Sequence, residues 1–311
     1  MPTATSVTDA RGVIDELYLL SAVPLADYVD YVKRHTVNGM DVEEGSLIDF
    51  WRNAANNFQD RQLREEGIVD KAELLELPAS MNAFRDTVMR DRRFEQTYSS
   101  LPISFGMVEL DTLVVYQPGI RLNHVANILA SLVRPVSEKV LFDLCFPIDR
   151  PTPDVHVSRS AGRRYVFRSS AVDMRFLGAR LMGREMSAAL PAEGAVVEAI
   201  GLLVGFGSSY LNVVRHGTRT VLNNGYHRAY ALRSMGISHI PCVIQGVANS
   251  QELEFAGASE LVRDYDALFA SKRPPLFKDF FDSSLTTTLR TPPTRKQIQI
   301  SFEIDTLTVP E

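Results

Sequence analysis

The sequence predicts an α+β fold, in which a mixed sheet-and-helix domain lies between a helical N-terminal module and a helical C-terminal extension. Three observations lead to it. Apolar residues recur at helical spacing over residues 10–100. The pattern then changes to β-branched and aromatic residues over 103–116. Residues 220–244 read as strand, glycine turn, helix, glycine stop and strand.

The N-terminal module, residues 1–100, is expected to be helical after a polar, loose stretch at residues 1–12. Helical periodicity starts at Val13 and is broken by Pro24, which favours the first turn of a second helix reaching Arg34. Residues 46–66 predict a long amphipathic helix that Gly67 ends, and residues 80–98 predict another.

The central domain, residues 101–250, is expected to carry an inserted segment at 134–185. Residues 155–170 predict a hairpin with Ala161-Gly162 at its tip. Residues 195–206 predict an apolar helix or buried element, and 211–223 predict a second hairpin. The C-terminal part, 251–311, is expected to form short helices and one edge strand over 297–307.

The insertion contains many arginines and few acids. One interpretation is a basic face for nucleic acid or a phosphorylated ligand. The other is an arginine-rich surface with internal partners, which we favour because no series of stacking aromatics is interleaved with it. The arginines are Arg159, Arg163, Arg164, Arg168, Arg175, Arg180 and Arg184.

The stretch 220–244 contains a candidate anion site. First-turn amides of a helix have no internal partners, and the helix dipole makes that end positive. Gly225 is expected to let an anion approach, and His227 with Arg228 adds donors and charge. The alternative is structural: Gly225 only makes the turn, His227 caps a carbonyl, and Arg228 pairs with a carboxylate.

The sequence NGYHRAYALRSMGISHIPCVI resembles the G-x-H-R or G-x-R-R box of the ParB/sulfiredoxin-like superfamily. Gly225, His227, Arg228, Gly236 and Pro241 fall in register with that box. The preceding LNVVRHGTRTVLNN is similar to the hairpin found before it. The resemblance covers residues 196–247, with a weaker echo at 105–124.

The resemblance implies a fold in which the box contacts nucleotide phosphates. Members diverge: some bind and hydrolyse CTP and clamp DNA, some use ATP and a cysteine in the box, and others resemble free-serine kinases. Here Tyr226 stands where sulfiredoxin has its cysteine, so that chemistry is not expected. One arginine of the ParB box is replaced by His227, and no helix-turn-helix follows.

The candidate site residues come from the box and from the weaker echo. We expect His227 and Glu109 as acid–base residues, since imidazole titrates near neutrality. The alternatives for the residues of the echo are a surface arginine, a capping His124 and a solvated glutamate. No metal-ligand spacing is visible. The predicted phosphate-binding residues are Asn224, Gly225, Tyr226, His227, Arg228 and Arg121.

Three functions are consistent with these residues. The first is a nucleotide-dependent phosphotransferase or NTPase that uses a nucleoside triphosphate with Mg²⁺. The second is a non-catalytic module that senses a phosphate-bearing small molecule or binds a protein partner of unknown kind. The third, not favoured, is a nucleic-acid-binding or nuclease-like protein using residues 159–184.

Composition constrains partners and compartment. A net charge of −5 and a pI near 5.8 give no general attraction to nucleic acid or anionic membranes. The two cysteines, Cys145 and Cys242, favour a reduced setting. No signal peptide and no apolar run of membrane-spanning length are visible, so we expect a cytoplasmic protein.

Overall fold

The computed structural model describes residues 12–148, 151–160, 163–171, 173–183, 189, 194–207, 209–256 and 265–309. Its contacts divide the chain into two compact units. Unit 1 comprises Met1–Ile148 and Ser209–Pro293, and unit 2 comprises Asp149–Ser208 and Thr294–Glu311. Helices combine with antiparallel and mixed sheets, so the α+β class is confirmed.

These boundaries differ from the three expected modules. The N-terminal module and the central domain belong to one unit, because strands from residues 14–121 pair with strands from 212–291. The expected insertion at 134–185 overlaps unit 2, which starts and ends further along the chain.

A five-stranded sheet forms the centre of unit 1. Strands β9 and β11 are parallel, and every other neighbouring pair is antiparallel. Residues 240–245 of β11 are buried, as expected for an apolar strand inside a sheet. The order is β10 (Arg219–Asn224), β9 (Asn212–His216), β11 (His239–Gly246), β3 (Ile103–Glu109) and β2 (Leu74–Glu76).

A second sheet of unit 1 has the order β12 (Thr286–Thr291), β1 (Ile14–Leu19), β4 (Gly119–Arg121). The prediction that helical structure begins at Val13 was therefore wrong. Tertiary pairing outweighs local periodicity here, because β1 is hydrogen-bonded on both edges by strands distant in sequence. As predicted, a helix begins directly after Pro24.

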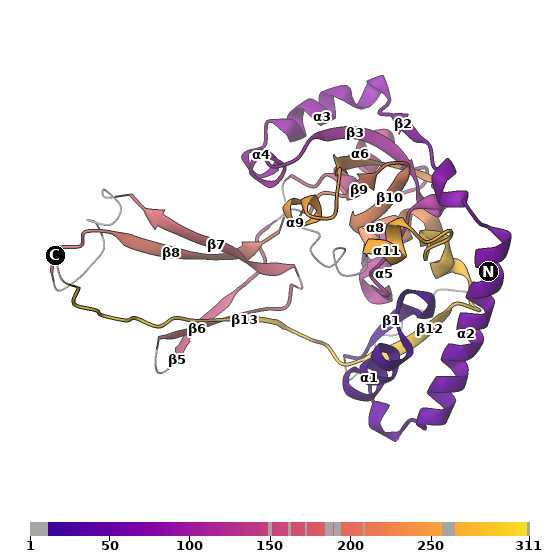
Figure 1. Ribbon diagram of the computed structural model, residues 1–311. Helices are drawn as coiled ribbons and strands as arrows, with labels where there is room; N and C mark the ends of the chain where they lie inside the picture. The colour runs from indigo at the N-terminus through magenta and orange to yellow at the C-terminus, as the bar shows by residue number, and fades with distance from the viewer. Residues whose placement is uncertain are drawn as a thin grey trace. The chain divides into compact units, whose positions relative to one another are not determined.

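The helices of unit 1 cover these sheets, and α5 and α8 lie side by side (Figure 1). The expected helix over 80–98 is divided in two, since the Asp91 carboxylate accepts from the Arg93 N–H and caps the second half. The helices are α1 (Leu25–His35), α2 (Glu44–Arg64), α3 (Asn82–Met89), α4 (Arg92–Thr97), α5 (Leu122–Ala130), α6 (Glu138–Cys145), α8 (Tyr226–Ser234), α9 (Glu252–Phe255) and α11 (Tyr265–Phe269), with the 3₁₀ turn η6 (Phe277–Phe281).

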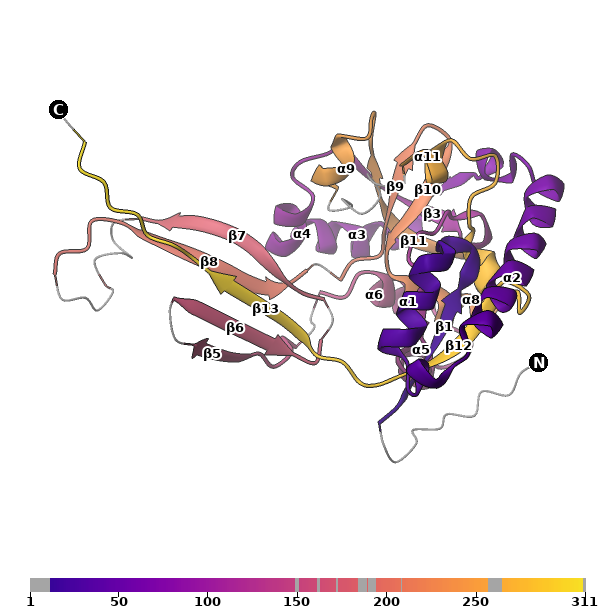
Figure 2. The same cartoon turned by 60° about the horizontal axis from the view of Figure 1, so that its bottom comes forward.

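Unit 2 consists of β-structure among the described residues (Figure 2). One sheet has the order β13 (Lys296–Ser301), β6 (Arg164–Ser169), β5 (His156–Ser160), and a two-stranded sheet pairs β7 (Met174–Met182) with β8 (Ala199–Phe206). The prediction of a helix or buried element at 195–206 was wrong, since β8 is a partly exposed strand. The expected edge strand at 297–307 corresponds to the shorter β13.

The predicted hairpin tip at Ala161-Gly162 and Arg184 lie outside the described residues. Some of the other arginines have partners within the unit. The Arg159 guanidinium lies 5.8 Å from the Tyr165 ring centroid, and Arg168 donates to Gln297. None of the described helices is long and apolar enough to cross a membrane.

A buried arginine joins the C-terminal part of unit 1 to α2. The Arg273 side chain has no exposed surface and donates to Asp279 Oδ1 at 2.6 Å and to Glu65 Oε2 at 2.8 Å. Asp279 also accepts the Leu276 N–H, and Lys278 pairs with Glu65. A buried guanidinium of this kind depends on its carboxylates.

Replacing Asp279 with alanine should strongly destabilise the protein, because Arg273 would stay buried with half of its charge partners removed. We expect the free energy of unfolding in urea to fall by about 3–5 kcal/mol. The control is Asp30→Ala, which breaks the exposed pair with Arg34 and should cost at most about 1 kcal/mol. Similar small losses in both variants would contradict this interpretation.

Candidate functional site

Helix α8 begins at Gly225, which has a left-handed φ of +109°. A Cβ atom added there would lie 2.7 Å from Leu211 Cγ. The turn and the packing both require glycine at this position. The predicted reason was wrong: the open side of Gly225 receives the Leu211 side chain, rather than leaving space for an anion.

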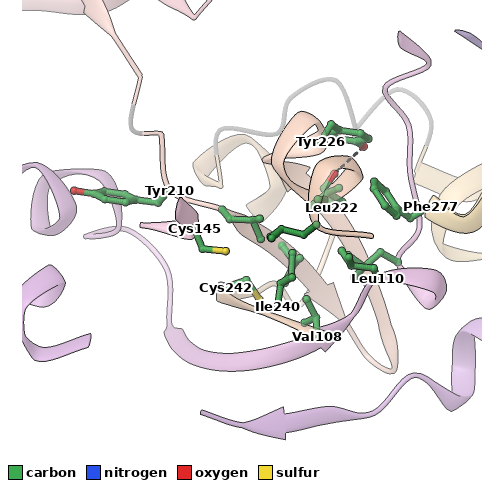
Figure 3. Close-up of a cluster of buried hydrophobic side chains, with 14 of the residues drawn as sticks. Val108, Leu110, Cys145, Tyr210, Leu222, Tyr226, Ile240, Cys242 and Phe277 are labelled. Carbon is green, nitrogen blue, oxygen red and sulfur yellow. Dashed lines mark hydrogen bonds between the residues drawn. The ribbon is translucent and has the colours of Figure 1, made fainter. Parts of the chain in front are cut away.

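Tyr226 and Asn224 are used inside the fold. The Tyr226 hydroxyl donates to the Leu222 carbonyl at 2.9 Å (Figure 3) and accepts the Tyr116 N–H at 3.2 Å. The Asn224 amide donates to the Tyr210 carbonyl. Tyr226 is buried, so its hydroxyl holds the segment after β3 rather than a ligand.

Arg228 points into the core and is 5% exposed. Its Nη1 donates to the carbonyls of Leu144 at 3.1 Å and Cys145 at 3.2 Å, in the last turn of α6. The last carbonyls of a helix lack internal partners, and a cation is favourable beside them. The structure thus gives Arg228 a capping role for α6, and its Nη1 is not directed to the predicted phosphate site.

His227 faces the beginning of α5. The main-chain N–H of Arg121 donates to His227 Nε2 at 3.1 Å, and the His124 ring meets the imidazole edge-on with centroids 5.0 Å apart. An N–H can only donate, so Nε2 must be unprotonated. Burial, followed by the positive charges of His124, Arg121 and Arg228, lowers the pKa of His227 to about 3.

His227 therefore does not fit the predicted role of a proton shuttle near neutrality. Its pKa lies far below that range, and its unprotonated nitrogen is already engaged by the Arg121 N–H. The same geometry does bring Arg121 and His124 to the box. We call this place the α5–α8 junction. It consists of the first turns of α5 and α8 and of four residues: Arg121, His124, His227 and Arg228.

The α5–α8 junction is an electropositive part of the molecule. Two helix N-termini meet there, and neither helix has an acidic residue in its first turn. A carboxylate is present on the neighbouring strand. Glu16 of β1 lies opposite Arg121 of β4 in the register of the sheet, and its carboxylate accepts a hydrogen bond from the Tyr31 hydroxyl at 2.6 Å.

Glu109 is not brought to the junction. It ends β3 opposite His239 of β11, which follows the C-terminal end of α8. Arg233 in the last turn of α8 pairs with Asp111 at 2.7 Å, confirming which end of the helix lies near Glu109. The nine residues of α8 span about 13 Å, so Glu109 and the box lie at opposite ends.

A polar cavity of about 430 Å³, which no predicted site residue lines, surrounds the Arg273 network. Its lining alternates in charge, and the signal was available in the mixed charges of KRPPLFKDFFD. The cations and carboxylates there pair with one another, which indicates a structural network. The lining residues are Arg61, Glu65, Arg273, Lys278, Asp279, Phe281, Asp282 and Ser283.

The two cysteines lie in the core (Figure 3). Burial raises the pKa of Cys145 to about 12 and raises that of Cys242 as well. Neither thiol is ionised near neutrality, so neither replaces the nucleophile that Tyr226 removes from the box.

The low pKa of His227 predicts a loss of stability in acid. The folded-state value, about 3, lies below the unfolded value near 6.5, so the unfolded chain takes up the proton first. This contribution is complete above pH 6.5 and is lost as the pH falls toward 3. His227→Gln keeps an acceptor for the Arg121 N–H but does not titrate.

We expect the parent to lose about 1–2 kcal/mol more than His227→Gln between pH 7.5 and pH 5, measured by urea unfolding. The control, His156→Gln, changes an exposed histidine of β5 and should keep the pH dependence of the parent. An identical acid sensitivity in His227→Gln and the parent would refute the assignment.

Comparison with known proteins gives no relative: no family model, curated protein or solved structure matches this chain. The geometry of the α5–α8 junction is therefore the basis on which a function can be argued.

Proposed function

We propose that this protein binds a phosphate-bearing small molecule, of the nucleotide class that the resemblance implies, at the α5–α8 junction. The observation that supports it most is the hydrogen bond from the Arg121 main-chain N–H to His227 Nε2, which brings the N-termini of α5 and α8 together. Burial is the main cause of the low pKa of His227, and the charges of His124, Arg121 and Arg228 lower it further. The positive potential of those charges would attract an anion.

The N-termini of α5 and α8 also favour an anion at the junction. Each carries roughly half a positive charge and main-chain N–H groups without helical partners. In α8 the first helical hydrogen bond is donated by Ala229 to Gly225, so the positive end of the helix dipole lies beside His227. Two such ends at one place favour an anion more than either alone.

Within this proposal the residues of the junction have different roles. Arg228 is assigned a contribution of positive charge rather than a direct contact with the ligand, because its Nη1 donates to the carbonyls of α6. Arg121 and His124, which the echo at 105–124 contributes, are the side chains we assign to the phosphate. Mg²⁺ would arrive with the phosphates of a nucleoside triphosphate.

The proposal is for binding rather than for phosphoryl transfer. General acid–base catalysis needs a titrating group within hydrogen-bond reach of the reacting atoms. His227 has too low a pKa for that task near neutrality, and Glu109 lies at the far end of α8. The ligand-sensing alternative is thus the form of the hypothesis that the geometry favours.

A nucleotide panel in a thermal-shift and urea-unfolding assay tests the proposal. A nucleoside triphosphate at a hundredfold its dissociation constant should stabilise the parent by about 2.7 kcal/mol. Arg121→Gln removes one charge from the junction and should weaken binding at least about tenfold, leaving roughly 1.4 kcal/mol at the same ligand concentration. Arg228 is a poorer choice, since its replacement also uncaps α6.

The matched control is Arg64→Gln, which removes the same charge from an exposed position near the end of α2. It should respond to nucleotides as the parent does. If no phosphate compound stabilises the parent, or if Arg121→Gln and Arg64→Gln respond equally, the junction is not the binding site.

A further inference from the structure

The strand β8 leaves an unprotected edge in unit 2. It pairs with β7 along one edge, and no other strand among the described residues pairs with it. Its eight residues, AIGLLVGF, contain no charge and no proline. Natural edge strands are usually protected from pairing by charged residues, by proline, by a bulge or by short length. The register shift of this hairpin falls at Phe176/Gly178, within β7.

The side chains of β8 are apolar and partly exposed. Ile200 is 67% exposed, Leu202 37% and Leu203 44%. Alternate residues of a strand also direct their main-chain N–H and C=O groups toward the free edge. A partner that covers this edge must therefore supply both apolar side chains and a row of main-chain hydrogen bonds, which is the chemistry of another β-strand.

We propose that β8 pairs antiparallel with β8 of a second copy, centred on Leu203, so that two hairpins form one four-stranded sheet. This proposal is independent of the anion site. A two-fold axis through Leu203 places Leu202 opposite Val204, Gly201 opposite Gly205 and Ile200 opposite Phe206 of the other copy. Each residue meets one of similar character, and a pair of an aromatic with a β-branched residue is favourable.

The neighbouring register is less favourable. In an antiparallel pair, the side chains of directly opposed residues lie on the same face of the sheet. Neighbouring residues of one strand point to opposite faces, so a two-fold axis between two identical strands must pass through a residue rather than between two residues. An axis through Leu202 would place the Glu198 carboxylate opposite Phe206 of the other copy. In the Leu203 register that carboxylate lies beyond the paired residues.

Charge is compatible with the proposed sheet. The charged residues of the hairpin strands, Arg175 and Arg180, belong to β7, which becomes the outer strand on each side. Three strand spacings separate the two outer strands, about 14 Å, which exceeds the Debye length at physiological ionic strength. The paired edge itself brings no like charges together.

Cysteine crosslinking tests the register. In the proposed pair the two Leu203 Cα atoms lie about 4.5–5.5 Å apart, within the range that a disulfide spans. Leu203→Cys should give a covalent dimer with oxidised glutathione. Leu202→Cys, whose Cα atoms would lie roughly 8 Å apart, should not. The native Cys145 and Cys242 are buried, so the background is low.

Light scattering after size exclusion tests the association itself. We expect the parent to have twice the 34.7 kDa mass of one chain. Leu203→Lys and Ile200→Lys should each weaken association at least about tenfold, with unchanged melting of the monomer. Leu181→Lys changes an apolar residue of β7 that is 73% exposed and should leave the dimer intact.

Three results would overturn the proposal. The first is a monomeric parent, and the second is crosslinking of Leu202→Cys as readily as Leu203→Cys. The third is an increase in mass only when duplex DNA is added, which would indicate that the β7–β8 hairpin binds nucleic acid through Arg175 and Arg180 instead.

Discussion

The hydrogen bond from the Arg121 main chain to His227 Nε2 joins the beginnings of α5 and α8. It requires a neutral imidazole whose Nε2 carries no proton, and it brings two helix N-termini to one place. Both consequences agree with the proposed anion site, because positive charges that oppose a proton on the ring would favour an anion nearby. The proposed function depends on this single contact more than on any other.

The box itself serves mainly as a structural support. Gly225 admits Leu211, Tyr226 holds the segment after β3, and Arg228 caps α6. These contacts fix the direction in which α8 begins. The residues assigned to the ligand come instead from β4 and α5, so the support and the binding surface belong to different parts of the chain.

Local chemistry made several features predictable. The glycine at the start of α8 has the positive φ that the Asn-Gly turn suggests, and Gly236 ends the helix with a φ of +87°. The hairpin before the box is present as β9 and β10. The meeting of Arg121 and His124 with the box followed from the resemblance rather than from periodicity.

Long-range contacts account for what could not be predicted. Strand β1 resembles a helix locally, and only its pairing with β12 and β4 decides otherwise. The same holds for Arg228, because a sequence does not show which carbonyl a buried guanidinium will reach. The partner of Gly225, Leu211, is likewise set by how β9 packs under the helix.

The most direct test is the imidazole ¹⁵N spectrum of His227, recorded against pH with and without inorganic triphosphate. The account predicts a neutral ring with an unprotonated Nε2 at pH 5, and a pKa that rises when triphosphate binds, because a bound anion stabilises the protonated ring. A His227 that titrates near 6.5 and does not respond to triphosphate would contradict it.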